Sequence, residues 1–488
     1  MNLSRTSLAT LLATAVLLLS GATIPLVAAQ SSNTGATETP LYVSHFYSST
    51  LPSGQLSPYC NVGSPSAPFD LICYTPQDIK TAYNYPSAKG WNGLDGSGQT
   101  IVIIDAFGSP TVQSDLNTFD TQFNLPPTTL QIVCQSGTCP VYNPSNADEF
   151  GWTQEIALDT QYAHAMAPGA HIVLFVTTSD DDLVMAQGAQ QAINMFPHSI
   201  ISQSWGDPES DLLTAPSSYV QAVISTSEAA YEQAAYMGTT VFASAGDSGA
   251  TNNYPTTNPS FPSSSPWVTA VGGTQGNPYY VGSIPSCTGW TCSTGLVKFL
   301  NTPSCQLDTE TPTTTASCIP IGYGGEQVWN EPFLSPPGAT GGAPSSIFTA
   351  PFYQRDVGLT MRATPDVSYN AAVSGGVLGY WSAPNDFGYP AGFYIFGGTS
   401  AGSPQWSAIA ALADQLAAQE HQRTIGFINP TIYSIGQSPW RYDRDFNDIT
   451  VGNNILSGTS LGYSAHSGWD DASGWGTPNV ANLIQDLV

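Results

Sequence analysis

Residues 396–404, with the sequence FGGTSAGSP, surround Ser400 with residue types that suit a nucleophile. The glycines permit a tight turn before the serine, and Pro404 fits the first turn of a following helix, where a missing N–H is not needed. Free N–H groups at the start of that helix can bind an oxyanion that develops beside the serine hydroxyl. A glycine-rich turn with a serine is also a common structural element, so Ser400 needs a partner base.

Two carboxylates on a predicted helix over residues 152–166 can supply that base. At about 100° per helical residue, Glu155 and Asp159 fall within the same arc of about 120° as a set of apolar side chains. These apolar residues are Trp152, Ile156, Tyr162, Ala163 and Met166. Gln154 and Gln161 are expected on the opposite face. Two carboxyls that share a buried face titrate as a pair, with a raised pKa for one proton.

A third carboxyl, Asp247, follows the predicted strand 240–244 in the sequence ASAGDSG. Catalytic and ligand-binding groups gather at the carboxyl edge of a parallel sheet. Asp105 has a comparable place after the predicted strand 101–104. We interpret Asp105 as a turn-forming residue outside the site, because Asp is common in turns.

An alternative catalytic set uses a histidine. The segment GTSAG matches G-x-S-x-G, the nucleophile elbow of α/β-hydrolases, and Asp448 and His466 follow Ser400 in the order that such a triad requires. None of the six histidines lies in a His-Gly-Thr setting, as a subtilisin-like histidine would. A secreted esterase that uses Ser400, Asp448 and His466 therefore remains an alternative.

A cluster of oxygen donors lies near the C-terminus, in residues 445–449 and 466–470. Hard oxygen ligands from carboxylates and backbone carbonyls in two neighbouring loops suit Ca²⁺. We therefore expect a calcium site in these loops, although Asp-rich loops are also common without a metal.

The elements that must position these groups alternate between strands and helices. Apolar runs that resemble buried parallel strands occupy residues 101–104, 172–176, 199–202, 240–244 and 267–271, and helices are predicted over 152–166, 182–195, 216–237 and 403–420. This alternation predicts an α/β fold with a mostly parallel sheet flanked by helices.

The composition excludes a nucleic-acid-binding protein. The 488 residues contain 9 Lys plus Arg against 35 Asp plus Glu, which gives a net charge of −26 and leaves nothing to line a phosphate backbone. Hydrophobic residues at 41% and aromatic residues at 11% are ample for a packed core and argue against disorder. So many carboxyls and so few cations point to acidic surroundings, in which most carboxyls are neutral.

The N-terminus and the cysteines indicate secretion. Residues 1–29 have one Arg, an apolar stretch and a small-residue cleavage site, as a signal peptide does, and we expect no membrane span after its removal. Residues 30–73 are interpreted as an N-terminal extension too short for a full-size prodomain. All eight cysteines follow the signal, and we expect near neighbours to pair in an oxidising compartment: Cys60–Cys73, Cys134–Cys139, Cys287–Cys292 and Cys305–Cys318. Residues 276–325 are interpreted as a disulfide-rich insertion.

Together these segments resemble the sedolisins, the serine-carboxyl peptidases, over residues 74–488. The motifs that carry the resemblance are, in chain order, Glu155-x-x-x-Asp159, Ser202-Gln-Ser-Trp-Gly206, Ala245-Gly-Asp-Ser-Gly249, Phe261-Pro-Ser-Ser-Ser-Pro266, Val271-Gly-Gly-Thr274, Trp329-Asn330, Pro365-Asp-Val-Ser368, Gly398-Thr-Ser400 and Asp448-Ile449. No single motif is decisive, but their order is specific.

The resemblance implies a subtilisin-like fold and a secreted, acid-active endopeptidase. Ser400 would be the nucleophile, Glu155 its general base, Asp159 the partner of Glu155, and Asp247 a protonated donor to the oxyanion. Ca²⁺ would bind the side chains of Asp448 and Asp470 and the carbonyls of Ile449, His466 and Gly468. The expected partners are protein or peptide substrates, and the chain is expected to be a monomer. A non-enzymatic surface protein, favoured by the Ser-, Thr- and Tyr-rich composition, is the third alternative.

Overall fold

The computed structural model describes residues 37–51, 59–61, 70–86, 93–276, 296–299, 320–332, 334 and 336–488. All of them belong to one compact unit, residues 35–488. The helices are α1 (Pro76–Ala82), α2 (Val112–Phe123), α3 (Ala147–Met166), α4 (Asp182–Met195), α5 (Glu209–Thr214), α6 (Ser217–Met237), α7 (Phe352–Arg355), α8 (Gly402–Gln419), α9 (Asn429–Gly436), α10 (Pro439–Asp445) and α11 (Val480–Leu487).

The central sheet has the strand order β15-β12-β10-β8-β5-β7-β6, with β20 also paired to β12. Every pair in it is parallel except that of β12 with β15. The strands are β5 (Thr100–Ala106), β6 (Gln131–Cys134), β7 (His171–Thr177), β8 (Ile200–Gln203), β10 (Thr240–Ser244), β12 (Thr269–Gln275), β15 (Gln327–Val328) and β20 (Val367–Asn370). The predicted α/β fold with a mostly parallel sheet is therefore confirmed.

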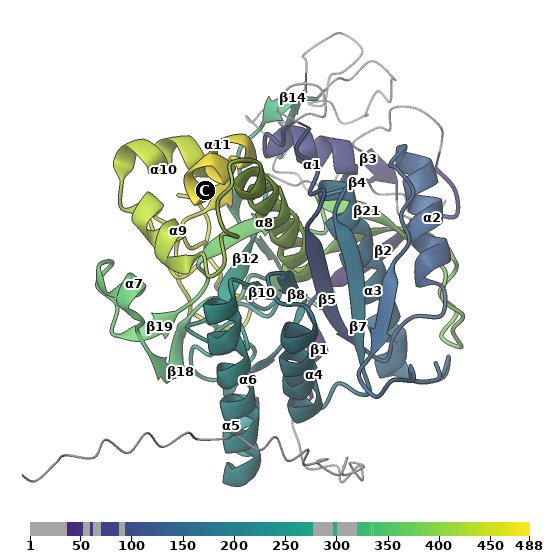
Figure 1. The fold of residues 1–488 in the computed structure, drawn as a ribbon, viewed down its shortest axis with the longest axis horizontal. Helices are drawn as coiled ribbons and strands as arrows, with labels where there is room; N and C mark the ends of the chain where they lie inside the picture. Colours follow the sequence, from purple (N-terminus) through teal and green to yellow (C-terminus); the bar gives the residue numbers. More distant parts are fainter. Residues whose placement is uncertain are drawn as a thin grey trace, which may run out of the picture. The chain divides into compact units, whose positions relative to one another are not determined.

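Alternate side chains of the central strands enter two separate cores. In β5, Ile101 and Ile103 belong to the core that includes Ile156 of α3 and Ile409 of α8, whereas Val102 and Ile104 belong to the core beneath α4 and α6. Because side chains alternate across a strand, a fully apolar strand requires a helical layer on each face. Figure 1 shows α4 and α6 on the near side of the sheet.

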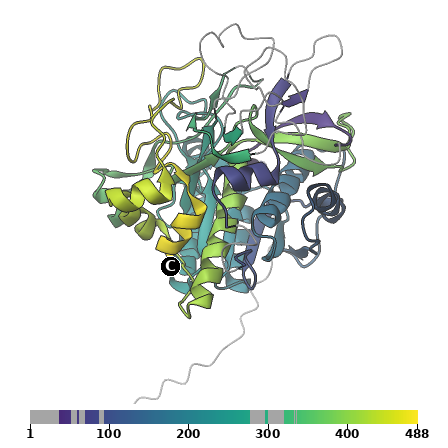
Figure 2. The same ribbon diagram turned by 90° about the horizontal axis from the view of Figure 1, so that it is seen from above.

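A second sheet, with the strand order β2-β22-β21-β4-β3, leads into Ser400. Its strands are β2 (Val43–Ser48), β3 (Tyr59–Asn61), β4 (Asp70–Tyr74), β21 (Gly376–Trp381) and β22 (Gly392–Gly397). In Figure 2 these purple and green strands lie together, apart from the yellow C-terminal helices. β22 ends at Gly397 and α8 starts at Gly402, so the predicted turn and following helix around the serine are confirmed, and a strand leads into the turn.

The remaining strands form small sheets. β1 (Thr39–Pro40), β9 (Trp205–Pro208) and β11 (Ser260–Phe261) make one of them. The others are pairs: β13 (Val297–Phe299) with β14 (Pro320–Tyr323), β16 (Asn330–Glu331) with β17 (Gly338–Ala339), β18 (Pro344–Thr349) with β19 (Met361–Ala363), and β23 (Phe446–Asn447) with β24 (Thr477–Pro478).

The prediction that α3 has a face directed away from the buried carboxyls and toward solvent is wrong. Gln154 and Gln161 are 2% and 0% exposed, because β2 and β21 cover the face that was expected to meet solvent. The Gln161 side chain donates to the Tyr380 carbonyl and accepts from the Tyr380 N–H, and Gln154 accepts from the Ser44 hydroxyl. A buried glutamine is tolerated when partners satisfy its amide, as they do for Gln161, whereas Gln154 Nε2 has no partner among the described residues.

Two of the four expected disulfides are confirmed, Cys60–Cys73 and Cys134–Cys139. The pairs Cys287–Cys292 and Cys305–Cys318, with most of the interpreted insertion over 276–325, lie outside the described residues. The interpreted signal peptide over residues 1–29 does so too.

Candidate active site

Ser400 lies in a short 3-10 turn, Thr399–Ala401, between β22 and α8. The turn is possible because Gly398 has a φ of +94°, in the left-handed region where a side chain is disfavoured. A Cβ on Gly398 would also lie 2.5 Å from Asp247 Oδ2. The glycine therefore both shapes the turn and lets Asp247 approach Ser400.

The Ser400 hydroxyl meets Glu155 of α3. Its Oγ donates to Glu155 Oε2 at 3.0 Å, and the Ser204 carbonyl at 3.1 Å is a second acceptor within reach. Ser400 and Glu155 are both fully buried. A carboxylate at this distance from a serine hydroxyl is placed to take its proton.

Asp159 lies one helical turn after Glu155 and is held by Ser204, whose hydroxyl donates to Asp159 Oδ1 at 2.9 Å. Glu155 Oε1 and Asp159 Oδ2 are buried and have no hydrogen-bond partner within the described residues. The sequence motif SQSWG contained Ser204, but nothing in the spacing indicated that it contacts both the serine and the aspartate.

Burial raises the pKa of both Glu155 and Asp159. For Glu155, the neighbouring charges of Asp159 and Asp105 raise the pKa further. For Asp159, the hydrogen bond from Ser204 partly opposes the rise. Two buried carboxyls this close resist holding two negative charges, so the pair retains a proton well above the usual range of an isolated carboxyl.

The interpretation of Asp105 as a turn residue is wrong, because Asp105 lies within β5. Its carboxyl is fully buried, and neither oxygen has a partner within the described residues. Asp105 lies on the same face of β5 as Ile101 and Ile103, which belong to the core that includes Ile156 of α3. Burial raises its pKa, and the charge of Asp159 raises it further. Its position at the carboxyl end of a buried strand was the available signal, and Asp247 shares that signal.

Asp247 reaches the serine turn from the loop after β10. Its Oδ1 accepts from both the N–H and the hydroxyl of Thr399, each at 2.8 Å. Its Oδ2 is buried and has no partner in the described part of the chain. Burial raises the pKa of Asp247 to about 7, although the bonds from Thr399 oppose the rise. Below that pH the carboxyl can donate a hydrogen bond from Oδ2.

The alternative triad is not assembled. The side chain of His466 is exposed and contacts the Ser467 carbonyl at 3.1 Å, while Asp448 accepts from Tyr442, Ser467 and the Gly468 N–H. The acceptors of the Ser400 hydroxyl among the described residues are Glu155 and Ser204.

The two loops expected to bind calcium do come together. The Gly468 N–H donates to Asp448, and the His466 N–H donates to Asp470 Oδ2 at 2.9 Å. Within the described residues, neither carboxylate pairs with a Lys or Arg, and the carbonyls of Ile449, His466 and Gly468 accept no hydrogen bond. Two carboxylates and three carbonyls that accept no hydrogen bond are donors of the kind that Ca²⁺ prefers. The described residues contain no cluster of three or more His, Cys, Asp or Glu side chains that could hold a metal, so calcium binding rests on the carbonyls as well.

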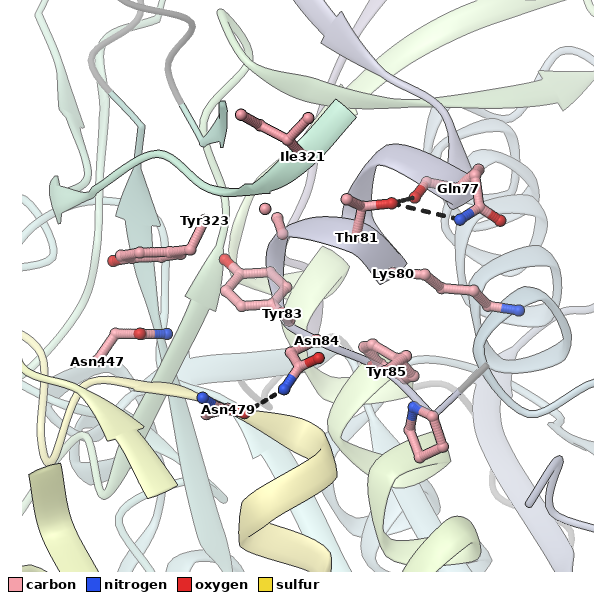
Figure 3. A pocket seen from close by; sticks show the side chains of 13 residues that line it. Gln77, Lys80, Thr81, Tyr83, Asn84, Tyr85, Ile321, Tyr323, Asn447 and Asn479 are labelled. Carbon is pink, nitrogen blue, oxygen red and sulfur yellow. Dashed lines mark hydrogen bonds between the residues drawn. The ribbon is translucent and has the colours of Figure 1, made fainter. Parts of the chain in front are cut away.

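A cavity of about 610 Å³ lies elsewhere, between α1, β14 and the C-terminal segment. Figure 3 shows Lys80, Tyr83 and Tyr323 among its lining side chains and the hydrogen bond between Asn84 and Asn479. Its lining contains none of the candidate catalytic residues, and we assign it no role.

Comparison with known proteins identifies the class. Residues 142–432 match the model of the subtilase family, Peptidase_S8, so the chain belongs to that family of serine-type endopeptidases. Within it the chain is sedolisin-like. It is similar to kumamolisin from Bacillus sp. (strain MN-32), with 29% identity over 85% of this chain and 64% of that protein.

Two further relatives support this assignment. Human tripeptidyl-peptidase 1 is 28% identical over 68% of this chain and 52% of its own length. The solved structure of a Pseudomonas sedolisin, a serine-carboxyl proteinase bound to two molecules of pseudo-iodotyrostatin, matches with a TM-score of 0.63 and 25% identity, covering 85% of this chain and 98% of that one. The subtilisin-like fold is thus confirmed, and the chain spans between one half and two thirds of kumamolisin and tripeptidyl-peptidase 1. Within the described residues, no helix has the length and apolar character to cross a bilayer.

Proposed function

We propose that the chain is an acid-active serine-carboxyl endopeptidase in which Ser400 is the nucleophile and Glu155 its general base. The observation that carries this proposal is the buried hydrogen bond of 3.0 Å from Ser400 Oγ to Glu155 Oε2. A serine needs an adjacent base to attack a peptide carbonyl, and here a carboxyl is in the position that imidazole has in other serine peptidases.

Proton transfer uses the pair on α3. Ser400 Oγ attacks the carbonyl carbon of the substrate while Glu155 accepts the hydroxyl proton. Asp159, held by Ser204, shares a proton with Glu155 and so limits the charge that the buried pair must carry. Glu155 then returns the proton to the leaving nitrogen, and water hydrolyses the acyl-enzyme by the reverse proton path.

The oxyanion is stabilised by two donors, the Ser400 N–H and protonated Asp247. Asp247 suits this role because Oδ1 is fixed by Thr399 while Oδ2 is free and buried. A carboxylic acid kept neutral by burial can donate to a developing negative oxygen. Ionised Asp247 would instead repel it.

The expected activity is bell-shaped in pH. As pH falls, the pair on α3 takes up its second proton and the base is lost; as pH rises through about 7, Asp247 ionises and the oxyanion donor is lost. The test is a pH–rate profile for hydrolysis of a denatured protein, with Ser400→Ala as the inactive control. Activity confined to neutral and alkaline pH would contradict a carboxylate base.

We propose that Ca²⁺ stabilises the loops around Asp448 and Asp470. It would be bound by these two carboxylates and by the carbonyls of Ile449, His466 and Gly468. Bound Ca²⁺ would neutralise two carboxylates that lack a cationic partner among the described residues. Chelation is expected to lower the unfolding temperature, and Asp470→Asn to abolish that calcium dependence. Equal unfolding temperatures with and without calcium would contradict the site. The measurement is thermal unfolding, which needs no substrate.

The substrates, the location and the oligomeric state of the enzyme are proposed from its composition and its relatives. Protein or peptide substrates, secretion into an acidic exterior and a monomeric state fit the charge balance, the disulfides and the relatives. Loss of solvent raises the pKa of many buried and half-buried carboxyls in the described chain, among them Asp78 to about 6, Glu228 to about 7 and Asp414 to about 7. Such groups make folding more favourable in acid than at neutral pH.

A further inference from the structure

A pocket of carboxyls lies beside β9, at a distance along the chain from the carboxyls that contact Ser400. Asp182, at the start of α4, is 1% exposed, and neither of its oxygens has a hydrogen-bond partner among the described residues. Asp207 of β9 is 6% exposed, and its Oδ2 is likewise without a partner there. Neither carboxyl forms an ion pair with a described Lys, Arg or His.

A peptide segment enters this pocket between two stretches of backbone. On one edge, β1 pairs antiparallel with β9. On the other edge, the Glu38 N–H donates to the Asp180 carbonyl at 2.8 Å, and Thr37 forms a bridge with Asp181, the residue before Asp182. A peptide held in this way is bound by its main chain, so its side chains are left to select between sequences.

The side chain of Glu38 turns into the pocket. Glu38 is 2% exposed, whereas Thr37 and Thr39 on either side of it are exposed, as the alternation of a strand requires. The register of β1 with β9, continued by one residue, sets Glu38 opposite Asp207. Directly opposite residues of an antiparallel pair have their side chains on the same face. Position 38 therefore marks where a peptide side chain meets the carboxyls.

The position of this pocket relative to the candidate active site is fixed by Leu41. The Ser400 N–H donates to Leu41 O at 2.9 Å, the contact that the carbonyl of a scissile bond makes in the proposed mechanism. Position 38 is three residues before Leu41. The pocket is thus a subsite for the substrate residue three places before the one whose carbonyl is attacked.

Glu38 itself matches this pocket poorly. Burial raises the pKa of its carboxyl well above the ordinary value, and the charges of Asp182 and Asp207 raise it further. Buried carboxyl oxygens without partners cost free energy unless a proton or a cation compensates them. The described residues contain no group of three or more His, Cys, Asp or Glu side chains that could hold a metal ion. A cation carried by the bound peptide therefore fits the pocket better than a metal ion does.

We infer that the pocket of Asp182 and Asp207 is a specificity subsite that binds a lysine or arginine side chain of the substrate, three residues before the residue that supplies the scissile carbonyl. The inference rests on the proposed function and adds a substrate preference to it. The ammonium or guanidinium takes the place of the Glu38 carboxyl and donates to the free carboxyl oxygens, while the main chain keeps its pairing with β9. Hydrogen bonds between two charged groups are stronger than those between neutral groups.

The first experiment compares peptides that differ at this position alone. Four otherwise identical substrates carry Lys, Gln, norleucine or Glu three residues before the leucine that supplies the scissile carbonyl, and product masses verify the cleaved bond. The full chain is expected to hydrolyse the Lys peptide with a kcat/KM about 10- to 100-fold above that of the Gln peptide, and the Glu peptide most slowly. Hydrolysis of the Lys, Gln and norleucine peptides at equal kcat/KM would overturn the inference and leave the proposed function in place.

Substitutions in the pocket identify the groups that select the cation. Asp182→Asn and Asp207→Asn are each expected to lower the ratio of kcat/KM between the Lys and Gln peptides, and the double variant to bring it close to 1. The exposed Asp356→Asn is the control, which should keep the wild-type ratio. A ratio that survived both pocket substitutions would overturn the inference.

The pH dependence of the same ratio is independent of the catalytic carboxyls, because they act on both peptides alike. Burial raises the pKa of Asp182 to about 7 and that of Asp207 to about 8, and neighbouring carboxyls raise both further. The other titratable groups around the pair are Glu38, Asp180, Asp181, Asp211 and Tyr219. A cation in the pocket favours the ionised carboxyls, so the ratio is expected to increase from about pH 4 to about pH 6.5. A ratio that did not increase would contradict the inference.

A last measurement needs no turnover and separates the inference from the proposed function. In the Ser400→Ala chain, hydrogen exchange of the Leu41 N–H, which donates to the Ser204 carbonyl at 3.1 Å, reports how firmly the segment is held. Near pH 6, Glu38→Lys is expected to slow this exchange about 10-fold relative to Glu38→Gln, and Asp182→Asn to remove most of the gain. Exchange in Glu38→Lys that was as fast as in Glu38→Gln would overturn the inference. Slower exchange in a protein whose wild type hydrolysed no peptide at any pH would support the cation pocket and overturn the proposed function.

Discussion

Two regions of the molecule contain carboxyls without access to bulk water, and they differ in the partners of the carboxyl oxygens. Asp366 is fully buried, and both of its oxygens accept from the Arg362 guanidinium at 2.6 Å. The Tyr433 hydroxyl, the Ala270 N–H and, at 3.4 Å, the Asn429 amide also donate to it. In the cluster around Ser400, Asp105, Glu155 and Asp159 are equally buried and Asp247 is half-buried, and no cation pairs with them among the described residues. Asp105, Glu155, Asp159 and Asp247 each keep at least one oxygen without a partner.

We interpret this difference as one between a buried acid that stabilises the fold and buried acids that can take part in proton transfer. Arg362 makes further bonds to the carbonyls of Ala363 and Val268, so the charge pair is saturated and has nothing left to exchange. An orphaned carboxyl oxygen in a dry site can instead hold or release a proton, at a cost in stability. In the proposed mechanism, the cluster around Ser400 therefore holds protons that it can exchange.

The largest expected effect comes from removing the acid that contacts the serine. Glu155→Gln keeps the size of the side chain but cannot accept the Ser400 proton, so turnover is expected to fall about 100- to 10,000-fold. The unfolding temperature should not fall, since a buried carboxyl without a cation is replaced by a neutral amide. Steady-state kinetics and thermal unfolding measure the two.

Glu331 is the matched control for Glu155. It is fully buried and also lacks a cation, but its oxygens accept from the Trp329 indole and from the N–H groups of Val373 and Ser374. Glu331→Gln turns an amide N–H₂ toward an N–H donor and is expected to lose about 1–3 kcal/mol of stability while turnover per folded molecule stays unchanged. If both variants lost activity to the same degree, the distinction between the two kinds of acid would fail.

Breaking the ion pair between Arg362 and Asp366 is expected to have the next largest effect. It should lower the free energy of unfolding and leave turnover per folded molecule unchanged. Arg362→Met leaves Asp366 buried without its cation and should cost about 3–5 kcal/mol in the free energy of unfolding. Urea titration of the variant and wild type at one pH measures this. A loss below 1 kcal/mol would mean that the remaining donors, Tyr433, Ala270 and Asn429, suffice to hold the carboxylate.

Substitutions of Asp247 test whether its protonated carboxyl donates a hydrogen bond to the oxyanion. Asp247→Ala removes one donor and is expected to lower kcat about 100- to 1,000-fold. Asp247→Asn keeps a donor that does not titrate, so the alkaline fall near pH 7 should disappear even where the rate is reduced. If Asp247→Asn retained that fall, another group would be responsible for it. The measurement is the pH dependence of kcat for both variants.

Much of this arrangement could be predicted from the sequence. The run of apolar residues in β5, β7 and β10 indicated strands buried on both faces, and the glycines and Pro404 around Ser400 indicated the turn before α8. The ordered motifs assigned Ser400, Glu155, Asp159 and Asp247 their roles by resemblance, and the structure brings these four together.

Other features could not be predicted, because they depend on contacts between distant segments. Periodicity in α3 gave one buried face, but β21 and β2 cover the other as well, and no local pattern reveals a strand 219 residues away that bonds to Gln161. Residues 37–44 show no clear apolar alternation that would predict their partners. The backbone pairs β1 with β9 and β2 with β22, while Tyr42 and Val43 pack against two different cores. Asp105 has the same local context as a turn residue until β5 is placed next to α3.

The smallest expected effect that distinguishes the two regions is the pH dependence of stability caused by Asp105. Its pKa is raised by burial, so the folded state keeps a proton that the unfolded state releases from about pH 4 upward. Each pH unit above that, until Asp105 ionises in the folded protein, weakens the fold by about 1.4 kcal/mol. Asp105→Asn removes this penalty: it should match the wild type near pH 3 and become the more stable protein toward pH 7. The exposed Asp148→Asn is the control, and urea titrations across the pH range measure both. If Asp105→Asn were less stable than the wild type at pH 7, the carboxyl would have to be ionised and satisfied in the fold, as Asp366 is, rather than a site that holds a proton.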